Sequence, residues 1–156
     1  MNLRTGLLIG GAAGAAGTTI LNTVTYLDMA IRGRPASSTP QDSIEQLSAR
    51  THLRIPGDGD TRDNRVAGLG PLLGVAAGVG VGALLGLAQA AGWRPGLGAS
   101  TAAAAAGALI AGNGPMTVLG VTDPRSWSAA DWTADAVPHL AYGVVTAAVL
   151  KGLTRT

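Results

Sequence analysis

Four long apolar segments, separated by polar ones, organise the chain. They cover about residues 3–31, 67–91, 97–121 and 129–153. A helix needs about 20 mostly apolar residues to cross a bilayer, and each segment is long enough. The third, with "ASTAAAAAGALIAG", is the least apolar, and we expect its neighbours to assist its insertion. The pattern predicts an all-α polytopic membrane protein with four transmembrane helices, in a single membrane domain of residues 1–156.

The first apolar segment also has features of a secretory signal peptide. Arg4 supplies a basic start, and the small residues 12–17 resemble a cleavage site. The apolar pattern continues past these residues to Ile31, so we interpret the segment as a transmembrane helix.

A polar loop, residues 32–66, separates the first two apolar segments. Pro35 and Pro40 are expected to end the first helix. The following "QDSIEQLSARTHL" places Ile44 and Leu47 near one helical face, which predicts a short amphipathic helix on the membrane surface, capped by Asp42 or Ser43. The next stretch, "GDGDTRDN", has the composition of a turn and lacks the ligand spacing of a calcium loop.

Composition supports membrane placement and excludes several functions. Hydrophobic residues make up 47% of the chain and charged residues 13%, with most charges between Arg32 and Arg65. There is no cysteine, no interleaving of aromatic and basic residues, and no nucleophile elbow or phosphate-binding loop. We therefore expect no enzymatic activity, no cofactor, no metal site and no nucleic-acid partner.

Glycines recur at every fourth position of the second apolar segment. We call this set the glycine stripe: Gly70, Gly74, Gly78, Gly82 and Gly86. Lipid tails are as apolar as leucine, so helices in a bilayer associate by close van der Waals contact, which small residues permit. The stripe predicts tight helix packing of the glycine-zipper type.

The other segments carry similar spacings. The first has Gly6, Gly10 and Gly14, and the third has Ala99, Ala103, Gly107 and Ala111. Packing within the chain is the preferred interpretation, and packing against a second chain is the alternative.

Polar residues inside apolar segments are costly and suggest a role. We hypothesise a polar cluster that serves a proton or a small polar solute, with interhelical hydrogen bonding as the simpler alternative; its members are Asn22, Asp28, Asn113, His139 and Tyr142. Asn113 precedes an expected helix interruption at Gly114–Pro115, while Asp135 is interpreted as solvated at the membrane interface. Ser128 and Asp131 have the spacing of a capping box.

Basic residues at the end of the first segment suggest contact with lipid. Arg32 and Arg34 sit where a basic pair can meet lipid phosphates. Membrane lipids are therefore expected partners. A count of Lys and Arg favours a cytoplasmic long loop, whereas the density of positive charge and the net charge favour the opposite orientation.

Two stretches resemble known membrane proteins. "GAAGTTILNTVTYLDMAIRGRPASSTPQDSIEQL" and "PHLAYGVVTAAVLKGL" resemble a group of uncharacterised actinobacterial membrane proteins and, more distantly, the YagU-like bacterial inner-membrane proteins. The second stretch holds a His-x-x-Tyr-Gly element, here His139, Tyr142 and Gly143. The resemblance implies a multi-pass protein of the bacterial inner membrane and no established activity.

Together these observations favour a non-enzymatic accessory or structural subunit of a larger membrane assembly, or a homo-oligomer. Its partners would be other membrane protein subunits or a second copy. The alternative is a small transporter or channel that uses the polar cluster.

Overall fold

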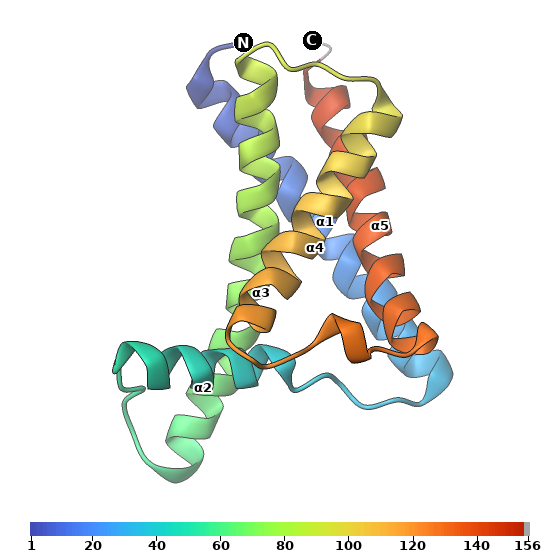
Figure 1. Ribbon diagram of the computed structural model, residues 1–156. Helices are drawn as coiled ribbons and strands as arrows, with labels where there is room; N and C mark the ends of the chain where they lie inside the picture. Colours follow the sequence, from blue (N-terminus) through green and yellow to red (C-terminus); the bar gives the residue numbers. More distant parts are fainter. Residues whose placement is uncertain (155–156) are drawn as a thin grey trace.

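The protein, described here by a computed structural model over residues 1–154, is built from α-helices. The helices are α1 (Leu3–Arg32), α2 (Thr39–Thr51), α3 (Gly59–Ala90), α4 (Leu97–Val118) and α5 (Ala129–Leu153), with a short 3-10 helix at Pro124–Ser126. Figure 1 shows α1, α3, α4 and α5 running lengthwise through the molecule, with both termini at one end and α2 lying across the other. The expected all-α class is confirmed.

Three of the four lengthwise helices are long and apolar enough to cross a membrane. These are α1, α3 and α5. The prediction of four such helices is therefore wrong for α4, which has 22 residues and is rich in alanine and glycine. An alanine methyl contributes little transfer free energy, and Asn113 and Pro115 near the helix end reduce it further.

Helix boundaries differ from the predicted spans mainly at the polar loop. Helix α3 begins at Gly59, so the stretch expected to be a turn forms its first two turns. Helix α4 continues through Pro115 to Val118. The expected interruption at Gly114–Pro115 is absent: α4 continues for three residues past Pro115, with only the hydrogen bond of the missing proline N–H lost.

Helix α2 is held against the bases of α3 and α4. Arg62 of α3 donates to both carboxylate oxygens of Glu45, with its Nη1 2.6 Å from Oε1. These bonds hold the pKa of the Glu45 carboxyl below its usual value. Arg50 donates from Nη2 to the carbonyl oxygen of Leu119 at 3.0 Å. These contacts fix the amphipathic helix α2 to the ends of α3 and α4.

The two helix starts show which capping signals hold. Ser128 and Asp131 form the expected capping box of α5. At α2, however, Ser38 is the N-cap residue and Pro40 lies in the first turn. Ser43 is buried and donates its hydroxyl to the Thr39 carbonyl at 2.7 Å, so neither it nor Asp42 is the cap.

Candidate functional site

Helices α1 and α3 meet through glycines on both sides. A methyl group added at Gly14 would lie 2.6 Å from the carbonyl oxygen of Gly78. One added at Gly6 would lie 2.6 Å from the carbonyl oxygen of Gly86, and one at Gly82 would lie 2.5 Å from that of Gly10. No side chain fits at these distances, so the two backbones are in direct contact within one chain.

Two members of the glycine stripe lie elsewhere. A methyl group at Gly70 would lie 3.0 Å from the carbonyl carbon of Pro40, in the first turn of α2. A methyl group at Gly74 would meet nothing within 4 Å. Residues four apart are rotated by about 40° around a helix of 3.6 residues per turn, so Gly70 is turned about 160° from Gly86. A straight helix therefore cannot present all five glycines to one neighbour.

Tyr142 is the centre of the packed bundle. Its side chain is fully buried, and its hydroxyl donates to the carbonyl oxygen of Gly78 at 2.6 Å. A methyl group at Gly17 of α1 would lie 2.7 Å from the tyrosine ring. Tyr142 thus joins α5 to α1 and α3, and its hydroxyl is occupied by a structural hydrogen bond.

Two close approaches were missed from the sequence. Gly17 makes room for Tyr142, and Gly143 brings α5 against α4, where a methyl group would lie 2.6 Å from the carbonyl oxygen of Thr101. Two sequence features could have indicated these contacts. Gly17 follows Gly14 by three residues, which extends the small-residue face of α1, and Gly143 belongs to the His-x-x-Tyr-Gly element.

The five residues of the predicted polar cluster do not come together. Asp28 pairs with Arg34 at 2.5 Å and with Arg32 at 3.4 Å at the end of α1. Tyr142 lies in the core, and Asn22 makes no side-chain hydrogen bond within residues 1–154. Only Asn113 and His139 share a group. These contacts do not join the five residues into one cluster. Such a cluster depends on how α1, α4 and α5 are rotated about their axes, which spacing along the chain does not specify.

Asn113 and His139 meet through Asp135, which links α4 to α5. The Asn113 amide donates to Asp135 Oδ2 at 2.8 Å. The Nδ1 atom of His139 lies 2.7 Å from the Asp135 carbonyl oxygen and 3.5 Å from its Oδ1. The side chains of His139 and Asp135 are 14% and 20% exposed. Asp135 therefore belongs to a partly buried polar group, and its interpretation as solvated was wrong. The i, i+4 spacing of Asp135 and His139 was the available signal.

No metal site is found in the part of the chain that the structure describes. No three His, Cys, Asp or Glu side chains there are placed to hold an ion. The Asn113–Asp135–His139 group can donate and accept hydrogen bonds, and its geometry supports the joining of two helices.

Arg32 and Arg34 have an internal partner. Both guanidinium groups contact the Asp28 carboxylate, which cancels one of their two charges. The expected contact of this pair with lipid phosphates must compete with that carboxylate.

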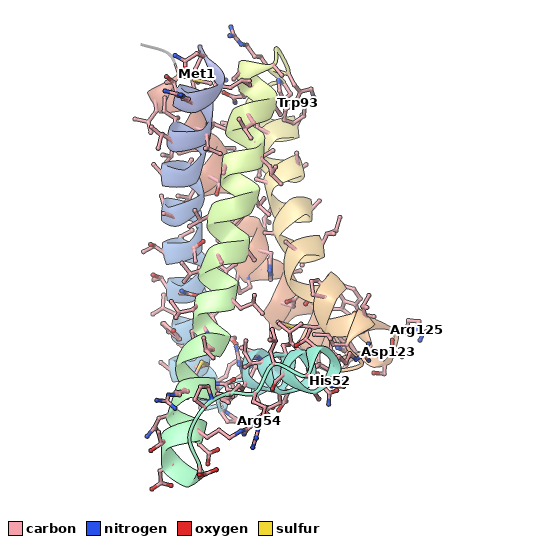
Figure 2. The ribbon with its side chains drawn as sticks, turned by 90° about the vertical axis from the view of Figure 1, so that its left-hand side faces the viewer. Met1, His52, Arg54, Trp93, Asp123 and Arg125 are labelled. Carbon is pink, nitrogen blue, oxygen red and sulfur yellow. The ribbon has the colours of Figure 1, made fainter. Side chains whose placement is uncertain are left out.

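An apolar groove opens on the outer side of the bundle, between α3 and α4. It has a volume of about 550 Å³. Leu84 and Leu85 of α3 line one wall, Gly107 and Ile110 of α4 line the other, and Trp93 belongs to the connection between the helices. Trp93 lies at the end of the molecule opposite α2 (Figure 2). Helices α1 and α3 are in backbone contact, whereas α3 and α4 leave this groove open between them.

These features define an all-helical bundle with three helices able to cross a membrane. No protein-family model, curated protein or solved structure matches the chain.

Proposed function

We propose that the chain is a non-enzymatic, multi-pass accessory subunit of the bacterial inner membrane. Its α3–α4 groove receives a transmembrane helix of a partner subunit. The proposed relationship to YagU-like proteins rests on the sequence motifs quoted above and agrees with this placement.

The open groove is the observation that carries the proposal. Gly6, Gly10 and Gly14 of α1 already pack against the backbone of α3 within the chain, so they offer nothing to a partner. In the groove, by contrast, Leu84 is 67% exposed and Ile110 is 71% exposed. Its α4 wall contains Ala103, Gly107 and Ala111, and small residues let a neighbouring backbone approach closely.

The absence of cysteine makes the groove directly testable by crosslinking. A Leu84→Cys variant, labelled in native membranes with a maleimide photocrosslinker, should give a discrete adduct with another membrane protein. Leu8 of α1 is 72% exposed and does not line the groove, so Leu8→Cys is the matched control. An adduct of twice the chain's mass would identify a second copy as the partner. Lipid adducts alone at Leu84→Cys, or equal protein adducts at both positions, would contradict the proposal.

Multi-pass placement predicts where loops and termini lie. We propose that α4 crosses the membrane with the other three helices because it packs lengthwise against α5, whatever its own hydropathy. Epitope tags placed after Thr156 and within residues 55–62 of the full chain should then be accessible from opposite sides of the membrane. Accessibility from the same side would mean that α4 does not cross.

The second candidate function is a pathway for protons or a small polar solute. The Asn113–Asp135–His139 group favours it, because an ionisable pair lies between two of the lengthwise helices. It ranks second because Asn22, Asp28 and Tyr142 lie outside this group.

A further inference from the structure

A second pocket lies at the base of α3, where the polar first turns give way to the apolar run. Its volume is about 490 Å³. The connection from α2 contributes Leu53, Arg54 and Ile55, and α3 contributes Arg65, Leu69 and Leu72. Figure 2 shows Arg54 below α2, in the connection that leads to the base of α3. Within the described residues the lining includes two arginines and no carboxylate.

The charge of Arg54 is uncompensated. Its guanidinium makes no hydrogen bond or ion pair in the part of the chain that the structure covers. Arg65 uses Nη1 to donate to the Pro56 carbonyl at 2.6 Å, which positions its guanidinium and neutralises nothing. Four other arginines at this end of the molecule are each paired with a carboxylate, unlike Arg54 and Arg65: Arg32, Arg34, Arg62 and Arg125. An anion at this pocket would therefore meet two positive groups, neither of which forms an ion pair within residues 1–154.

Apart from the two arginines and Asn64, the pocket is lined by apolar residues and glycine, and three of its leucines are exposed. Leu53 is 72% exposed, Leu72 is 62% exposed and Leu69 is 41% exposed. A helix rises 1.5 Å per residue, so Arg65 and Leu72 lie about 10 Å apart along α3. The charge stands at the polar end of the helix and the leucines toward the membrane, which is the order of phosphate and acyl chains in a phospholipid.

We propose that this pocket binds an anionic phospholipid, with its phosphate at Arg54 and Arg65 and an acyl chain against Leu69 and Leu72. The inference uses the membrane placement of α3 and makes no use of the α3–α4 groove. The crosslinking experiment can therefore contradict the proposed partner site without affecting the lipid site, and the lipid titration can contradict the lipid site without affecting the partner site.

Lipid titration of the full chain in neutral detergent tests the site. Native mass spectrometry should show tighter binding of dioleoylphosphatidylglycerol than of dioleoylphosphatidylcholine. Arg54→Gln should raise the Kd for the anionic lipid about fivefold, the effect of one arginine near an anionic surface. Arg125→Gln is the matched control, because it makes the same charge change in an exposed residue of the 119–128 connection that is paired with Asp123 alone. It should leave the Kd unchanged, and an equal loss in both variants would overturn the proposal.

Two further measurements separate a lipid from a soluble anion. Leu72→Ser should weaken binding of the anionic lipid, with helicity checked by circular dichroism, because it removes part of the acyl-chain wall. Glycerol 3-phosphate, which has the phosphate and no acyl chains, should not compete at equal concentration. Unchanged lipid binding in Leu72→Ser, or full competition by glycerol 3-phosphate, would identify a site for a free phosphate and overturn the lipid assignment.

Discussion

Gly82→Ala should lower the stability of the protein in detergent. The added methyl carbon would lie 2.5 Å from the Gly10 carbonyl oxygen and 2.5 Å from the Gly14 Cα atom. Both are backbone atoms, so α1 and α3 must move apart and lose many dispersion contacts together. Overpacking of this kind costs about 1–3 kcal/mol. It should outweigh the gain of roughly 1 kcal/mol that alanine brings to a helix interior. The measurement is the thermal unfolding midpoint.

Gly74→Ala is the matched control for this prediction. It makes the same substitution in the same helix and the same glycine stripe, but nothing lies within 4 Å of the added methyl group. The helix-propensity gain should then dominate, and the unfolding midpoint should stay level or rise. Equal destabilisation at both positions would mean that the stripe is a matter of composition and that α1 and α3 are not in backbone contact.

Tyr142→Ala should be the most destabilising single change in α5. Among residues 1–154, Tyr142 has the largest fully buried side chain, and it reaches both α1 and α3. Truncating a buried aromatic residue to alanine costs about 3–5 kcal/mol, because the surrounding helices collapse only partly into the cavity. Denaturant titration of the protein in mixed micelles measures this loss.

Two other tyrosine variants divide the loss into its parts. Tyr142→Phe keeps the ring and removes only the hydrogen bond to Gly78, so it should cost about 0.5–1.5 kcal/mol. Tyr26→Ala removes a ring that is 62% exposed and should have little effect. A Tyr142→Ala variant as stable as Tyr26→Ala would contradict the placement of Tyr142 at the centre of the bundle.

Features that depend on neighbours along the chain were predictable. Apolar length located α1, α3 and α5, since a helix satisfies its own backbone hydrogen bonds and its position follows from local composition. The capping box of Ser128 and Asp131 was likewise correct, because both partners lie within one turn. Local signals failed at α2, where several residues could serve as the N-cap and Ser38 takes that position rather than Asp42 or Ser43.

Features that depend on how helices rotate and pair were decided by the tertiary structure alone. Spacing along the chain places Gly78, Gly82 and Gly86 on one side of α3. The pairing of α3 with α1 brings these three into contact and leaves Gly74 open. The same holds for Asp135, which meets Asn113 only because α4 and α5 pack together. Spacing specifies an angle around one helix axis, whereas a contact needs the angles of two helices and their relative height, and those follow from the packing of the whole bundle.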